Sequence, residues 1–91
     1  MKRPENTTEL KKELRRAIDA GELTIGQATR RMRKIVGMTQ KEYAEKILKL
    51  TPRILVAIEN DRGNPTLATL RKIGKPFGYD VGFVARNRMS D

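Results

Sequence analysis

Apolar residues recur at intervals of three and four along most of this chain, a spacing that places their side chains on one face of an α-helix. The first such series is Leu10, Leu14, Ala17 and Ile18. It predicts an amphipathic helix with its N-cap at Thr7 or Thr8 and its last residue at Ala20, followed by Gly21 in the C′ position. We expect this helix to pack on the rest of the protein. The alternatives are a helix that docks a partner and one that lies on a membrane surface.

A second helix is predicted between Thr24, its N-cap, and Gly37, with Val36 as its last residue. Its inward positions are Ile25, Ala28, Met32, Ile35 and Val36. The last helix follows a loop at residues 60–65 that is rich in turn formers, and Thr66 is its N-cap. It carries Leu67, Leu70, Ile73 and Phe77 at helical spacing and is ended by Pro76 and Gly78.

Two more caps stand close together in the middle of the chain. Thr39 is followed three residues later by Glu42, which is the sequence of a capping box. Thr51 is followed by Pro52, which fits the first position of a helix. The two short helices that these caps predict cover residues 40–49 and 52–60. Ala44 is small enough for them to cross closely, and such a crossing forms a helix-turn-helix, which is built to place one helix in a DNA groove. On this pattern alone, the alternative is an ordinary helical hairpin of a small bundle.

Residues 79–86 (YDVGFVAR) alternate imperfectly and include β-branched and aromatic side chains, which favours one short strand. A lone strand leaves its backbone hydrogen bonds unmade, and no second strand is evident in the sequence. We therefore expect this strand to pair with its copy in a second protomer across a two-fold axis. An irregular tail folded over the core is the alternative. The residues expected at the dimer contact are Val81, Phe83 and Val84.

Together these elements predict an all-α fold. It is a compact helical bundle that contains a helix-turn-helix, with an N-terminal amphipathic helix and a C-terminal strand added to it. The expected segments are a disordered tail at 1–6, the N-terminal helix at 7–21, the DNA-binding domain at 24–78, the dimerisation strand at 79–86 and a tail at 87–91.

Charge and composition narrow the function. The 91 residues include 20 Lys and Arg against 11 Asp and Glu, a net charge of +9 that favours a polyanionic partner. The chain contains no Cys and no His, so thiolate and imidazole metal ligands and the commonest general base are missing. We expect no metal, no cofactor and no enzymatic activity. No apolar run reaches the roughly 20 residues of a membrane span, and we expect a cytoplasmic protein.

Several short motifs occur together between residues 25 and 78. They are Arg33, GMTQ at 37–40, Tyr43-Ala44, Leu50-Thr51, IEN at 58–60 and GNPTLATLRKI at 63–73. In this combination, the segment resembles the Cro and lambda-repressor-like DNA-binding domain, also called the XRE family. The resemblance implies a bundle of about five helices whose second and third helices form the DNA-reading unit. The C-terminal strand is similar to that of HipB-type antitoxins, which dimerise through it.

The resemblance also implies roles for single residues. The positions that face a DNA groove are Pro52, Arg53, Ile54 and Ala57, and those that contact the DNA backbone are Gln40, Lys41, Thr51, Asn60, Arg62 and Asn64. Arg33 and Glu59 match a structural pair that bridges the first and third helices of the family. Among the groove positions only Arg53 can hydrogen-bond a base edge, which is a thin basis for sequence discrimination.

The turn between the two central helices departs from the family pattern. The segment Ile47-Leu48-Lys49-Leu50 is one residue longer than usual and lacks the customary glycine. Either the second helix gains a residue or the turn bulges, and these alternatives would dock the recognition helix at different angles.

These observations favour a sequence-specific DNA-binding repressor. It would bind a palindromic operator in double-stranded DNA as a homodimer, with half-sites about 34 Å apart or a multiple of that. An autoregulating antitoxin is one role within this class, with a cognate toxin held by the N-terminal helix or the C-terminal tail. The alternative is a protein-interaction module with decayed DNA reading, which the apolar Ile54, Val56 and Ala57 would suit. An RNA-binding protein is less favoured, because only two Tyr and two Phe are available for stacking on bases.

Overall fold

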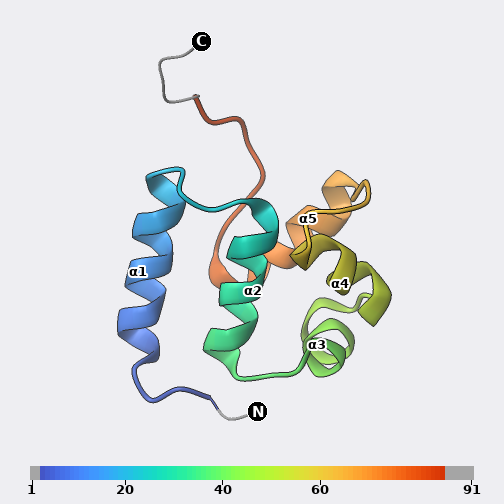
Figure 1. The fold of residues 1–91 in the computed structure, drawn as a ribbon, viewed down its shortest axis with the longest axis horizontal. Helices are drawn as coiled ribbons and strands as arrows, with labels where there is room; N and C mark the ends of the chain where they lie inside the picture. Colours follow the sequence, from blue (N-terminus) through green and yellow to red (C-terminus); the bar gives the residue numbers. More distant parts are fainter. Residues whose placement is uncertain (1–2, 86–91) are drawn as a thin grey trace.

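Five α-helices make up most of residues 3–85, the part of the chain that the computed structural model describes (Figure 1). Their bounds are α1 (Thr7–Asp19), α2 (Ile25–Val36), α3 (Gln40–Glu42), α4 (Pro52–Glu59) and α5 (Leu67–Gly74). A π-helix, Tyr43–Leu48, continues α3, and a 3₁₀ turn, Lys75–Phe77, follows α5. No β-strand occurs within residues 3–85, and the predicted all-α fold is confirmed. None of the helices in this range has the length and apolar character that crossing a membrane requires.

Threonine caps begin four of the helices, as the sequence predicts. Each lies in extended conformation, and its hydroxyl accepts a hydrogen bond from the backbone N–H three residues later. These caps are Thr24, Thr39, Thr51 and Thr66. Gln27 and Glu42 complete capping boxes at the first two. The predicted cap at Thr7 or Thr8 is wrong, because α1 already includes Thr7, and Asn6 stands at its N-cap without a side-chain hydrogen bond.

The hydrophobic core draws residues from α1, α2, α4, α5 and the π-helix. Its buried side chains are Leu14, Met32, Ile35, Tyr43, Ala44, Leu48, Leu55, Ile58 and Ile73. Helix α1 packs against α2 and buries Leu14 and Ala17, so the N-terminal helix is one of the five helices of the bundle. The inward position predicted for Ile25 is wrong, since Ile25 is 55% exposed, and Leu67, predicted to share the spacing of its helix, is 57% exposed. Each is the first residue of its helix, and helical periodicity does not say where the packed part of a helix begins.

The π-helix can accommodate the additional residue that the family resemblance predicts between α3 and α4. A π turn closes its hydrogen bonds between residues five apart and so contains one residue more than an α turn. The N–H groups of Lys49 and Leu50 both donate to the carbonyl oxygen of Ala44, the second of them at 2.9 Å. Lys49 ends the helix in the left-handed conformation, with φ of 59°, at the position where glycine is customary. Of the two alternatives, the second helix gains the residue.

Replacing Lys49 by glycine is expected to raise the free energy of unfolding by about 1 kcal/mol. The left-handed conformation costs a residue with a Cβ roughly 1–2 kcal/mol, and glycine avoids this cost while losing more chain entropy on folding. Urea unfolding followed by circular dichroism measures the difference. Lys46→Gly, inside the same helix, is the matched control and is expected to lower stability by about 1 kcal/mol. A lower stability for Lys49→Gly as well would contradict the interpretation.

The chain leaves α5 through a tight turn. Gly78 has φ of 79°, and the N–H of Tyr79 donates to the carbonyl oxygen of Gly74 at 3.0 Å. Residues 79–85 continue without regular structure, so the predicted strand is not formed in the described chain. A strand needs a second strand for its hydrogen bonds, and residues 3–85 offer none. Residues 1–2 and 86–91 lie outside the described residues. They include the start of the predicted N-terminal tail, the last residue of the predicted strand and the whole predicted C-terminal tail.

Candidate nucleic-acid interface

Helix α4 is anchored in the core on one side and accessible on the other. Leu55 and Ile58 are buried. At 3.6 residues per turn, Arg53, Ala57 and Asn60 fall on the opposite side of the helix. Of the residues predicted to face a DNA groove, Arg53 and Ile54 are exposed, and Pro52 and Ala57 are half-buried. Figure 1 shows α3 and α4 together on the side of the molecule away from α1.

An open hollow of about 260 Å³ lies between α4 and the loop that follows it. Its lining includes Ile54 and Ala57 from α4 and Arg62 and Asn64 from the loop. The structure thus brings together two predicted groove positions and two predicted backbone contacts. The other predicted backbone contacts lie at helix ends: Gln40 and Lys41 at the start of α3, Thr51 at the start of α4 and Asn60 at its end.

Glu59, the last residue of α4, is only 2% exposed and connects three elements. Its carboxylate accepts hydrogen bonds from Nε and Nη2 of Arg33 at 2.8 and 3.0 Å and from Nε2 of Gln40 at 3.0 Å. The structure therefore brings together Arg33 and Glu59, the pair expected to be structural. The side-chain amide of Gln40 donates to Glu59. The backbone N–H of Gln40, at the start of α3, is therefore the group that remains for the predicted phosphate contact.

Arg30 is part of this arrangement, although sequence analysis missed it. Its Nη2 donates to the carbonyl oxygen of Glu59 at 3.1 Å and to Oδ1 of Asn60 at 3.4 Å. A cation is favourable there, since the C-terminal end of a helix carries partial negative charge. The available signal was the spacing of three between Arg30 and Arg33, which places both on one side of α2.

Tyr43 lies fully buried close to this pair. Among the described residues its hydroxyl has no hydrogen-bond partner. Burial and, to a smaller degree, the negative charge of Glu59 raise the pKa of Tyr43 to about 12, while Arg33 opposes the shift. The phenol is therefore neutral at physiological pH, and its ring is a part of the core rather than a surface for stacking on bases.

Asp61 connects the end of α4 to the start of α2. Its carboxylate accepts a hydrogen bond from the Thr24 hydroxyl at 2.7 Å and one from the backbone N–H of Gly26 at 2.9 Å. The approach is close because Gly26 has no side chain: a Cβ there would lie 2.5 Å from the carbonyl oxygen of Ile58. Sequence reasoning missed this contact, because the partners are 37 and 35 residues apart and no local motif marks them.

A helix-turn-helix family model matches residues 30–84. This chain belongs to the Cro and lambda-repressor type of helix-turn-helix protein. It is similar to the immunity repressor protein of Bacillus phage phi105, with 37% identity over 62 residues. The matched region is 68% of this chain and 42% of the phage protein, so the chain spans less than half of that curated relative. No solved structure matches the chain at a significant level.

The surface of the helix-turn-helix is dominated by positive charge. Exposed cations along α3, the turn, α4 and the next loop are Lys41, Lys46, Lys49, Arg53 and Arg62. The acids in the same stretch are largely engaged within the protein. Glu59 is buried, while Glu42 and Asp61 accept hydrogen bonds from backbone N–H groups at helix starts. The charge offered to a ligand at this helix-turn-helix is therefore positive, which favours an anion.

The contact of Asp61 is expected to make stability depend on pH. Hydrogen bonds from the Thr24 hydroxyl and the Gly26 N–H hold the pKa of Asp61 below its ordinary value. A lowered pKa in the folded state adds stability above the unfolded value of about 3.9, and that stability is lost as pH falls through the folded pKa. Asp61→Asn is expected to lower the melting temperature at pH 7 and to flatten its decline below about pH 4. Asp19→Asn, at the exposed end of α1, is the control. If the melting temperature of Asp61→Asn declined below about pH 4 as steeply as that of the unmodified chain, the result would contradict the assignment.

Proposed function

We propose that this protein is a sequence-specific DNA-binding transcriptional repressor that acts as a homodimer on a palindromic operator. The observation that carries the proposal is the outer side of α4, where Arg53 is exposed opposite the buried Leu55 and Ile58. Membership of the helix-turn-helix family and the similarity to a phage immunity repressor support it. Such a regulator performs no catalysis and acts in the cytoplasm, where the DNA is.

In this proposal α4 lies in the major groove. Arg53 hydrogen-bonds a guanine, because its guanidinium suits the two acceptors on the major-groove edge of that base. The apolar surfaces of Pro52, Ile54 and Ala57 contact thymine methyl groups. One hydrogen-bonding side chain per half-site gives limited discrimination. The rest comes from the distance between the two copies of α4 and from the shape of the DNA.

The phosphates on either side of the groove are held by residues at the ends of the two helices. Lys41 and Arg62 supply charge, and both are exposed. The hydroxyl of Thr51 accepts a hydrogen bond from the N–H of Ile54 at 3.3 Å, which leaves its own proton to donate to a phosphate. Asn60 and Asn64 add neutral donors, and the backbone N–H of Gln40 contributes at the start of α3. These contacts fix orientation without reading sequence.

The test is selection of binding sites from a random library of duplex DNA, repeated at two salt concentrations. We expect a palindromic consensus with half-sites about 34 Å apart or a multiple of that, and an affinity that falls steeply with salt. Binding that depends on salt but selects no consensus would overturn the proposal.

An autoregulating antitoxin is the narrower role we propose within this class, based on the similarity of the C-terminal segment to HipB-type antitoxins. A toxin would be held by the N-terminal helix, whose exposed positions include Lys11, Lys12 and Arg15, or by the C-terminal tail. Affinity capture from the native host is the test. If it returns no tight protein partner, the antitoxin role is excluded and the repressor role stands.

A specific observation also favours a second candidate, a protein-interaction module. Ile54 and Val56 are apolar and exposed on α4, and exposed apolar surface often marks a partner site. This candidate predicts that Arg53 is dispensable, so the Arg53→Ala experiment in the Discussion separates the two.

A further inference from the structure

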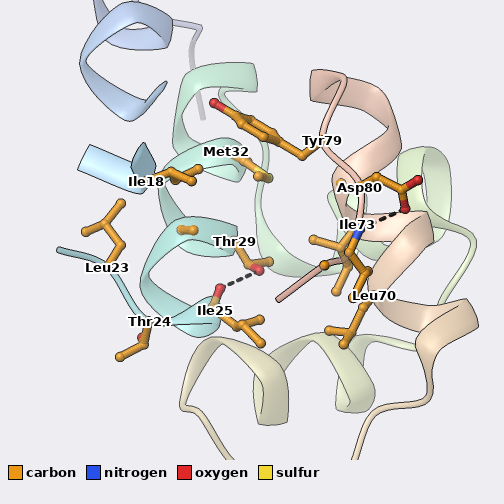
Figure 2. A pocket seen from close by; sticks show the side chains of 14 residues that line it. Ile18, Leu23, Thr24, Ile25, Thr29, Met32, Leu70, Ile73, Tyr79 and Asp80 are labelled. Carbon is orange, nitrogen blue, oxygen red and sulfur yellow. Dashed lines mark hydrogen bonds between the residues drawn. The ribbon is translucent and has the colours of Figure 1, made fainter. Parts of the chain in front are cut away.

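An apolar groove of about 260 Å³ lies between α2, α5 and the segment that follows α5 (Figure 2). Its main apolar walls are Ile18, Ile25, Met32, Leu70, Ile73 and Val81. The hydroxyls of Thr24 and Thr29 also line it, but both donate within the protein, to Asp61 and to the carbonyl oxygen of Ile25. With these two hydroxyls engaged and most of the lining apolar, the groove favours an apolar occupant over a polar one.

The chain itself carries apolar side chains immediately beyond this groove. Gly82 is the last residue that lines it, and the next two residues, Phe83 and Val84, are almost fully exposed. The exit of this segment is anchored by the hydrogen bond of Tyr79 to Gly74, where a Cβ at residue 74 would lie 2.7 Å from the carbonyl oxygen of Tyr79. Phe83 is therefore held next to the groove of its own chain, but its side chain does not enter that groove.

The lining of the groove is nearly free of charged side chains, as contact between two copies of this basic chain requires. Two copies of this chain carry +9 each and repel one another, so they can meet closely only where cations are few. Asp80 is the one charged residue in the lining of the groove, and its carboxylate lies 3.7 Å from Nε of Arg71. No residue of α3 or α4 lines the groove, so contact there leaves the proposed DNA-reading side free.

We propose that the groove receives Phe83 and Val84 of a second copy, and that the exchange is reciprocal across a two-fold axis. The same chain then supplies both the apolar projection and its receptor, which is the self-complementarity that an isologous dimer requires. The inference rests on the homodimer of the proposed function and deepens it. The contact is made by side chains that enter a groove rather than by a ladder of backbone hydrogen bonds between two strands.

The absence of cysteine from this chain allows a direct test. Two single variants, Ile25→Cys and an affinity-tagged Phe83→Cys, are mixed and oxidised mildly. Disulfide-linked species are then separated by mass. A disulfide needs Cα atoms within about 7 Å, so the expected main product links residue 25 of one copy to residue 83 of the other. Val56→Cys mixed with Phe83→Cys is the matched control and is expected to give little product. A predominance of links between two copies of Phe83→Cys would overturn the proposal in favour of paired strands.

Sedimentation of the unmodified chain and of Phe83→Ser completes the test. The variant is expected to raise the dissociation constant of the dimer about tenfold or more. Leu67→Ser, which removes an exposed apolar side chain at the start of α5, is expected to leave it unaltered. A monomeric wild-type chain, or equal effects of the two variants, would overturn the inference. Far-UV circular dichroism confirms that both variants are folded. Binding to a duplex with a single half-site is measured separately, so that failure of this dimer and failure of DNA binding are distinguished.

Discussion

Replacing Glu59 by alanine is expected to lower the free energy of unfolding by about 3–5 kcal/mol, the cost of leaving a buried charge without its partner. The guanidinium of Arg33, whose side chain is 11% exposed, would lose both of its hydrogen bonds to the carboxylate. Gln40 would lose its acceptor as well, and with it a hydrogen bond between α3 and α4. Urea unfolding followed by circular dichroism is the measurement.

Two further variants define the origin of this effect. Glu45→Ala removes an exposed carboxylate from the neighbouring helix and is expected to change stability by less than about 0.5 kcal/mol. The double variant Arg33→Met with Glu59→Leu is expected to be less destabilised than Glu59→Ala, because no charge then remains buried. A loss below about 1 kcal/mol in Glu59→Ala would mean that Arg33 reaches solvent once its partner is gone.

Replacing Arg53 by alanine is expected to remove the hydrogen-bonded part of the sequence discrimination of the proposed repressor. A bidentate contact between arginine and guanine contributes about 1–3 kcal/mol, and a dimer makes it twice, so operator affinity falls by about 2–6 kcal/mol. Affinity for unrelated DNA is expected to fall much less. Binding to the selected operator and to a scrambled duplex, by fluorescence anisotropy at fixed salt, gives both values.

Arg15→Ala is the matched control for this experiment, because it removes the same charge from an exposed position on α1. It is expected to leave the ratio of specific to non-specific affinity unchanged. An equal loss on both duplexes in Arg53→Ala would assign Arg53 to a phosphate. Unchanged binding with an intact fold would favour the protein-interaction module.

The helix starts could be predicted because their signals are local. At Thr24, Thr39, Thr51 and Thr66 the cap and its partner N–H lie three residues apart, so the sequence contains the whole interaction. The predicted start of α1 is the one that was wrong. Thr7 and Thr8 both have a suitable hydroxyl, but α1 includes both residues, and Asn6 stands at its N-cap. Family resemblance, rather than local pattern, supplied the pairing of Arg33 with Glu59.

Contacts between distant residues could not be predicted in the same way. The hydrogen bonds of Asp61 join positions 35 and 37 residues apart, and the contact of Gln40 with Glu59 spans 19. Nothing in a local pattern distinguishes these side chains from solvated ones. The C-terminal segment shows the opposite error: its composition favours a strand, yet the described chain contains no second strand to complete one.

The π-helix also affects how recognition helices can be exchanged between this protein and its relatives. The additional residue predicted from the family resemblance would lie between Thr39 and Thr51, where the π-helix stands before the start of α4. In a chimera designed by counting from Thr39, every transplanted side chain would be rotated by about 100° around the helix axis, because an α-helix turns once in 3.6 residues. If the recognition helix of a relative is instead joined at Thr51, its side chains keep the same orientation around the helix axis as those of α4.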